Sequence, residues 1–272
     1  MKIGYYIKKL PLQGDARIEA LLGELSAAGA ELYRISGKED VLPGSAMLLS
    51  FGGDGTFLSA AHRVSEAGVP ILGVNFGRMG FLSENRIEDV ARAILDGKFS
   101  IEERNMLQVV CRGSVIPGLW PYALNEAGLH RIGAEMIGVD VTIDGEQLPT
   151  YWADGLLVAT SSGSTAYSLS AGGPICTPDA NVELLTPVAP HNLNLRPLVL
   201  PSGSVVELSA QSRLGEVVLS LDNRNYRLPA GTVIEVKEAP FKLKRVKIGK
   251  SNFIDALRSR FFWGQDVRNI NE

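Results

Sequence analysis

Hydrophobic and polar positions follow two different patterns along the chain, and the change falls near residue 100. In the first part, short apolar runs alternate with segments whose apolar residues recur every three or four positions. The runs predict buried strands, and the spaced segments predict helices. Predicted strands cover 2–7, 31–35, 46–51 and 69–74, and predicted helices lie between Asp15 and Gly29, over 56–67 and over 87–95. Such alternation is typical of a mostly parallel sheet covered on both faces.

Beyond residue 100 the helical spacing largely disappears. Val139, Val141 and Ile143 alternate with polar residues, and the Asp144-Gly145 pair that follows is a hairpin turn signal. The predicted strands here are 107–111, 122–126, 139–143, 155–160, 205–210, 216–221, 232–236 and 241–248. Helical spacing returns in 252–262, where Ile254, Leu257 and Phe261 share a face.

These patterns predict an α/β N-terminal domain followed by a β-rich C-terminal domain, with a terminal helix that returns to the first domain. The domain boundaries that we expect are 1–100 for the α/β domain, 101–248 for the β-rich domain and 249–272 for the helical segment. A chain of 272 residues is long enough for this organisation.

Composition narrows the class of partner. The net charge of −3 gives no electrostatic footprint for nucleic acid or for an anionic membrane. No apolar run reaches the length of a membrane span, and 1–6 lacks the form of a signal peptide. The two cysteines, Cys111 and Cys176, form no CxxC pair. We therefore expect a cytoplasmic protein that binds neither nucleic acid nor membrane.

The first candidate site is the turn Gly52-Gly53-Asp54-Gly55, between the predicted strand 46–51 and the helix that starts at Thr56. Glycines at such a turn let backbone N–H groups approach a phosphate. Asp54 would repel that phosphate, so a carboxylate here is better explained if it accepts a proton or holds a metal during phosphoryl transfer. A plain turn is the alternative.

A second glycine-bearing loop, 75–82, follows the next predicted strand. Ligands of parallel sheets bind at the carboxyl ends of the strands. Both glycine loops belong at that edge, so we expect them to face the same crevice.

Two further stretches lie in the β-rich part. The segment 154–174 begins with Asp154, crosses an apolar strand and reaches a series of serines and threonines around Tyr167. Hydroxyl groups bind sugars and phosphates without adding charge, and a tyrosine can stack on a base. The pair Asn125-Glu126 could hold the two hydroxyls of a ribose. The alternatives are a helix cap in a surface loop for the first stretch and a strand end meeting solvent for the second.

Several common sites are not supported. The chain has no Gly-x-x-x-x-Gly-Lys-[Ser/Thr] run and no Gly-x-Gly-x-x-Gly fingerprint at the start of a helix. Its three histidines, His62, His130 and His191, lack metal-ligand spacing.

Taken together, the motifs resemble those of the NAD kinase family. Gly52–Thr56 matches the first motif of the family, Leu124–Glu126 the second and 154–174 the long third, while 185–191 and 196–199 resemble a later segment. The resemblance runs from about Ala46 to Val236. Diacylglycerol and sphingosine kinases share the first motif, but the third separates NAD kinases from them.

The resemblance implies an α/β N-terminal nucleotide-binding domain followed by a β-rich C-terminal domain that binds NAD. It further implies transfer of the ATP γ-phosphoryl group to the adenosine ribose 2′-hydroxyl of NAD, which gives NADP. It also implies a divalent metal ion, with Mg²⁺ expected, and a homodimer or homotetramer. Asp54 would be the catalytic base, and the amides of Gly52, Gly53 and Gly55 would bind the phosphates. Contacts with NAD would come from Asp54, Gly55, Phe81, Leu82, Asn125, Glu126, Asp154, Ser162, Thr165, Ala166, Tyr167, Ser168, Leu169, Ser170 and Ala189.

The sequence departs from the family in three places. Trp152 stands where many members have a basic residue, and Ser161 replaces a proline. The third place follows the late aspartate Asp222, where the family often has a small or polar residue and this chain has Asn223-Arg224. Arg224 is a candidate to compensate for the charge missing at Trp152. A lipid kinase and a non-catalytic dinucleotide sensor are the alternative functions. The first would need an apolar channel or a basic surface, and the second would not need Asp54.

Overall fold

The computed structural model describes residues 1–77, 80–249 and 253–261. The chain forms two compact units, Met1–Glu103 with Lys244–Glu272 and Arg104–Leu243. The first unit is α/β and the second is built from β-sheets, as the sequence predicted. The unit boundaries fall between Glu103 and Arg104 and between Leu243 and Lys244, a few residues from the predicted domain boundaries at 100 and 248.

The first unit contains a six-stranded sheet with the strand order β2-β1-β3-β4-β18-β5. Its elements are β1 (Lys2–Ile7), α1 (Ala16–Ala27), β2 (Glu31–Arg34), β3 (Met47–Gly52), α2 (Asp54–Val64), β4 (Ile71–Asn75), α3 (Ile87–Leu95), β5 (Phe99–Arg104), β18 (Leu243–Ile248) and α5 (Phe253–Phe261). Short 3₁₀ turns lie at Leu10–Leu12 and Ser65–Ala67. Strands β1, β2, β3 and β4 pair in parallel.

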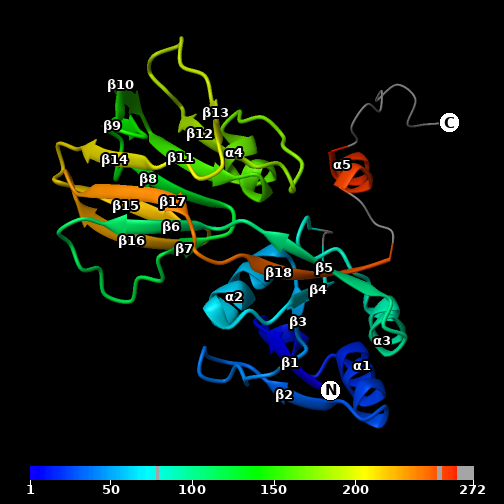
Figure 1. Ribbon diagram of the computed structural model, residues 1–272. Coiled ribbons are helices and arrows are strands. Elements are labelled where there is room, and N and C mark those ends of the chain that lie inside the picture. The colour runs from blue at the N-terminus through cyan, green and yellow to red at the C-terminus, as the bar shows by residue number, and fades with distance from the viewer. Residues whose placement is uncertain (78–79, 250–252, 262–272) are drawn as a thin grey trace. The chain divides into compact units, whose positions relative to one another are not determined.

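Helices cover both faces of this apolar sheet. Helices α1 and α3 pack together on one face, and α2 covers the other (Figure 1). Side chains of α1 and α3 close a core with the fully buried Ile3, Leu49 and Phe51 of the sheet. Helix α1 begins where its sequence predicts, since the Asp15 carboxylate accepts a hydrogen bond from the Arg17 amide.

One strand lies in a different sheet from the one expected. The apolar run 241–248 was assigned to the β-rich domain, but β18 pairs in parallel with β4 through Arg245 and Ile71. In that place the buried Arg245 bonds to Glu84 and Glu102, and the buried Val246 packs in the core of the first unit. An apolar pattern alone does not record such a pairing.

The second unit contains two six-stranded sheets, ordered β10-β9-β14-β17-β6-β7 and β13-β12-β11-β8-β15-β16, in which the pairings are antiparallel. The strands of the first are β6 (Leu107–Cys111), β7 (Tyr122–Ala123), β9 (Ile137–Ile143), β10 (Glu146–Ala153), β14 (Val206–Gln211) and β17 (Val233–Glu238). Those of the second are β8 (Glu126–His130), β11 (Gly155–Thr160), β12 (Val182–Val188), β13 (Leu198–Pro201), β15 (Glu216–Leu221) and β16 (Arg224–Pro229). A 3₁₀ turn at Ser162–Thr165 and the helix α4 (Tyr167–Ser170) follow β11.

The predicted strand 122–126 is interrupted in the structure. Tyr122–Ala123 pairs in one sheet and Glu126–His130 in the other, so the chain changes sheet at Leu124 and Asn125. The Asn125-Glu126 motif therefore lies at a crossing between sheets.

Candidate active site

The glycine turn joins β3 to α2 at the carboxyl edge of the first sheet. Gly53 is the N-cap of α2, and the amides of Thr56 and Phe57 bond to its carbonyl. A Cβ atom added at Gly53 or Gly55 would meet no atom within 4 Å. The turn is therefore open on the side where an anion could approach the start of the helix.

Asp54 is the first residue of α2, and its carboxylate is enclosed by the loop after β4. Oδ2 accepts a hydrogen bond from the Phe81 amide at 2.7 Å, and Oδ1 accepts bonds from Leu82 at 3.0 Å and Ser83 at 2.9 Å. A Cβ atom at Gly80 would lie 1.8 Å from Oδ1, so only glycine lets the loop pass this close. The two glycine loops thus meet at one edge, as expected.

The side chains of Phe81 and Leu82 differ in environment. Leu82 is buried in the first unit, whereas Phe81 is half-buried and contacts the rings of Phe253 and Phe261 in α5, at centroid distances of 5.8 and 5.6 Å. The loop that carries the amides is therefore fixed by α5 through Phe81.

A second carboxylate makes the same pattern of bonds in the second unit. Asp222, just after β15, accepts hydrogen bonds from the amides of Leu124 at 3.0 Å, Asn125 at 2.8 Å and Glu126 at 3.3 Å. Sequence analysis noted Asp222 only as the late aspartate before Arg224. Its signal was an aspartate straight after an apolar strand, where it adopts a φ of 52°.

Asn125 and Glu126 are both buried, and the chain packs tightly around them. A Cβ atom at Gly163 would lie 2.0 Å from the Asn125 carbonyl oxygen, and the Thr160 hydroxyl bonds to the Leu124 carbonyl at 2.6 Å. Glycine at 163 therefore lets the start of the third motif approach the second motif.

The surroundings of Glu126 favour its protonated form. Burial, and then the charge of Asp222, raise its pKa to about 8, while the Tyr167 amide acts in the opposite direction. Burial also raises the pKa of Asp222, and the three backbone amides and Arg224 oppose that rise. Among the described residues Oε2 of Glu126 has no hydrogen-bond partner. A protonated carboxyl can donate one hydrogen bond to a ligand as well as accept.

Asp154 precedes β11 and Ala189 follows β12, at the end of these strands that lies opposite to Glu126. Gly155 pairs with both His130 and Val188, and Ala159 pairs with Glu126. These positions on β11 are separated by roughly 13 Å at the rise of a strand. An elongated ligand lying along β11 could reach both ends.

Asp154 has a charged partner that sequence analysis did not identify. Nε and Nη2 of Arg131 donate to its carboxylate at 2.6 and 3.2 Å. Arg224, the candidate for the charge missing at Trp152, instead donates to the carbonyls of Trp120 and Tyr122 and lies 3.9 Å from Asp222. Arg131 therefore supplies the positive charge next to Asp154.

The hydroxyl-rich stretch divides into structural and accessible members. Ser168 is fully buried and bonds to Thr186 at 2.9 Å, and Ser164 bonds to Cys176. Tyr167 is exposed and stacks on His130 at 5.6 Å between ring centroids. The remaining predicted contacts in this stretch are half-buried or exposed and lie in the turn and helix after β11: Ser162, Thr165, Ala166, Leu169 and Ser170.

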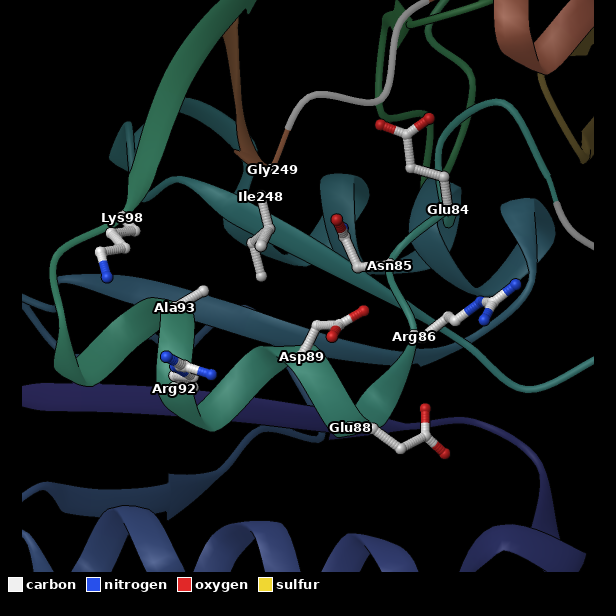
Figure 2. A pocket seen from close by; sticks show the side chains of 10 residues that line it. All are labelled: Glu84, Asn85, Arg86, Glu88, Asp89, Arg92, Ala93, Lys98, Ile248 and Gly249. Carbon is white, nitrogen blue, oxygen red and sulfur yellow. The ribbon is translucent and has the colours of Figure 1, made fainter.

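A separate pocket of about 680 Å³ lies in the first unit beside α3. Figure 2 shows acidic and basic side chains around it, including Glu84, Asp89 and Arg92. None of the predicted site residues lines it, so its mixed charge is separate from the glycine turn. In the described ranges no group of three or more His, Cys, Asp or Glu residues could hold a metal ion, and no helix is long and apolar enough to cross a membrane.

An α/β unit whose glycine turn carries a carboxylate at the start of a helix has the parts that a nucleotide-binding phosphotransferase uses. The family model of the ATP-NAD kinase N-terminal domain matches residues 39–97, and that of the ATP-NAD kinase C-terminal domain matches residues 124–248. The chain therefore belongs to the ATP-NAD kinase family.

Curated relatives agree over most of the chain. A NAD kinase of Porphyromonas gingivalis is 39% identical over 98% of this chain and 99% of its own length. A NAD kinase of Flavobacterium psychrophilum is 38% identical over 94% of this chain and 88% of its own. One from Bacteroides fragilis is 42% identical over 82% of this chain and 78% of its own. This similarity confirms the expected kinase function rather than the lipid kinase alternative.

Solved structures agree in fold. A yeast NADH kinase in complex with NADH superposes with a TM-score of 0.86 and 25% identity, over 99% of this chain and 90% of that one. A NAD kinase from Archaeoglobus fulgidus in complex with ATP gives a TM-score of 0.77 and 26% identity, over 96% and 98% of the two chains.

Proposed function

We propose that the protein phosphorylates the 2′-hydroxyl of the adenosine ribose of NAD with the γ-phosphoryl group of ATP, and that Asp54 is the base. The observation that carries this proposal is the position of the Asp54 carboxylate, held by three amides at the open end of α2. Each carboxylate oxygen has more than one lone pair, so the amides leave acceptor sites for the hydroxyl proton. The oxygen that loses this proton attacks the γ-phosphorus, and ADP leaves.

The phosphates would be bound by the glycine turn. The amides of Gly52, Gly53 and Gly55 stand at the positive end of the α2 dipole, and the space next to Gly53 and Gly55 is open. Preorganised N–H groups stabilise charge that develops on the transferred group.

The acceptor would lie along β11 of the second unit. Asn125 and the protonated Glu126 can each donate and accept hydrogen bonds, which suits the two hydroxyls of a ribose. Asp154 and Ala189 would meet the nicotinamide end, and the exposed ring of Tyr167 would lie along a base or sugar. Phe81, Leu82, Ser162, Thr165, Ala166, Ser168, Leu169 and Ser170 complete the proposed contacts.

A divalent ion, with Mg²⁺ expected, fits the chemistry of these groups. Mg²⁺ keeps several waters and is usually bound by substrate phosphates with one or two carboxylates rather than by a protein cage. Asp54, the first residue of α2 after the turn, would supply such a carboxylate. The ion would neutralise charge on the phosphates. A cytoplasmic homodimer or homotetramer is part of the same proposal.

One coupled assay tests the proposal. Purified protein is incubated with ATP, Mg²⁺ and NAD, and an NADP-specific dehydrogenase reports the product. We expect NADP to form with wild type and to fall by about 10²–10⁴-fold with Asp54→Asn. A protein that binds NAD but makes no NADP would support the sensor alternative, and near-normal turnover of the variant would exclude Asp54 as the base. Diacylglycerol as acceptor is the control for lipid kinase activity, and size-exclusion chromatography with light scattering measures the oligomer.

A further inference from the structure

Arg260 has a buried charge that the proposed function does not yet use. All three of its guanidinium nitrogens are buried, and none has a hydrogen-bond partner among the described residues. Buried polar groups in native proteins are nearly always paired, so an unpaired guanidinium calls for an explanation. Its neighbour Arg258 on the same helix is exposed.

The guanidinium lies against the residue that begins the amide loop. Its Cζ is 4.0 Å from the centroid of the Phe81 ring, and the rings of Phe253 and Phe261 flank the same side chain. Phe81 is also the residue whose amide makes the shortest bond to Asp54. Helix α5 therefore holds the donors of the Asp54 carboxylate through one aromatic ring.

The charges around Arg260 lie on several elements. Burial lowers the pKa of the Arg260 guanidinium, the charges of Asp54 and Glu84 raise it, and Arg245 of β18 lowers it. Arg245 itself is paired with Glu84 and Glu102. Of these two arginines, Arg245 has carboxylate partners, whereas Arg260 has none among the described residues.

We propose that Arg260 is a positioning residue for phosphoryl transfer: its guanidinium, stacked on Phe81, keeps the amides of Phe81–Ser83 on the Asp54 carboxylate. This inference rests on the proposed function, because it assigns the base to Asp54. A guanidinium suits this task, since it stacks on an aromatic face and stays charged when buried.

Two substitutions separate the charge from the stacking. Arg260→Met keeps an apolar side chain and removes the charge, whereas Arg260→Lys keeps the charge and loses the planar group. We expect Arg260→Met to lower kcat by about 10–100-fold with little change in the KM for NAD, because the amides on Asp54 are no longer held in place. Arg260→Lys should lose about tenfold or less in kcat. Arg258→Met is the matched control and should resemble wild type.

The readouts distinguish this role from a structural one. A purely structural residue would lower the melting temperature and the amount of folded enzyme, but the kcat of the folded fraction would stay at the wild-type value. A wild-type kcat for folded Arg260→Met, or a loss explained wholly by unfolding, would overturn the inference. If Asp54→Asn is inactive while Arg260→Met is normal, only this inference fails. If Asp54→Asn is active, the base assignment itself fails.

Discussion

Two aspartates of this molecule make the same hydrogen bonds in different surroundings. Asp54 accepts three consecutive amides, Phe81–Ser83, and Asp222 accepts the three amides of Leu124–Glu126. In each case a carboxylate fixes a loop that follows or joins strands at the edge of a sheet. The hydrogen-bond pattern alone therefore does not assign a role to either residue.

The surroundings of the two carboxylates differ. The side chain of Asp222 is 4% exposed, and Arg224 lies 3.9 Å away. Asp54 is half-buried at the start of α2, next to a turn with open space. A buried carboxylate with a nearby arginine orders the backbone, whereas one at an open helix start can also meet a substrate. We infer that Asp222 positions the Asn125-Glu126 pair, the proposed ribose site, and that Asp54 takes part in the proposed reaction.

Asp54→Asn should give the largest effect. Asparagine has nearly the same shape, but it is a very weak base and presents an NH₂ group to one of the three amides. We expect kcat to fall by about 10²–10⁴-fold while NAD still binds. The coupled assay measures kcat, and calorimetric titration with NAD measures the binding affinity. Equal losses of kcat and of NAD affinity would remove the distinction between the two aspartates.

Asp222→Asn should have the opposite profile. The variant leaves at least one amide of Leu124–Glu126 without an acceptor in a buried place, which costs on the order of 2–3 kcal/mol in the free energy of unfolding. We expect a higher KM for NAD with a kcat within about tenfold of wild type, since the base is untouched. Urea denaturation and steady-state kinetics test this. A stable variant with a collapsed kcat would contradict a purely positioning role.

The sequence predicted the elements around Asp54 better than those around Asp222. Strand β3, helix α2 and strand β4 follow each other closely, and their patterns are local, so the carboxyl edge of the sheet could be derived from spacing. Asp222 lies about a hundred residues from the amides that it accepts. No periodicity reports a contact between residues so distant in the chain.

Other features could not be predicted from the sequence, for two physical reasons. Strands β10, β13 and β16 carry many exposed or half-buried positions, so they lack a clear apolar pattern and were not predicted. The Arg131–Asp154 pair and the protonated state of Glu126 depend on burial and on neighbours from other strands. The residue types of the site were readable, but their protonation and pairing required the fold.

Gly80→Ala and Gly163→Ala should change the kinetics less than the aspartate variants do, and they test whether the two loops have separate roles. The new Cβ atoms would lie 1.8 Å from Asp54 Oδ1 and 2.0 Å from the Asn125 carbonyl oxygen, so each loop must move. We expect Gly80→Ala to lower kcat and Gly163→Ala to raise the KM for NAD, each by roughly tenfold. Gly23→Ala, with no atom within 4 Å of the added Cβ, is the control and should be neutral or slightly stabilising. Identical kinetic effects of the two loop variants would count against separate roles.

Glu126→Gln should give the smallest effect, and it depends on pH. The pKa of Glu126 is raised from 4.5 to about 8 in the folded protein, so its proton is retained where the unfolded chain releases it. The contribution of Glu126 to stability is therefore fully present below pH 4.5 and is lost as the pH rises through about 8. Glutamine has no such loss.

The free energy of unfolding of Glu126→Gln should therefore gain on that of wild type as the pH rises, by about 1–2 kcal/mol between pH 6 and pH 8. Urea titrations at several pH values measure the difference, and the exposed Glu146→Gln is the control with no expected trend. A constant difference across this range would mean that Glu126 is ionised in the folded state. The ribose would then meet an ionised carboxylate, which only accepts hydrogen bonds. Asp222 would lie beside a second buried negative charge.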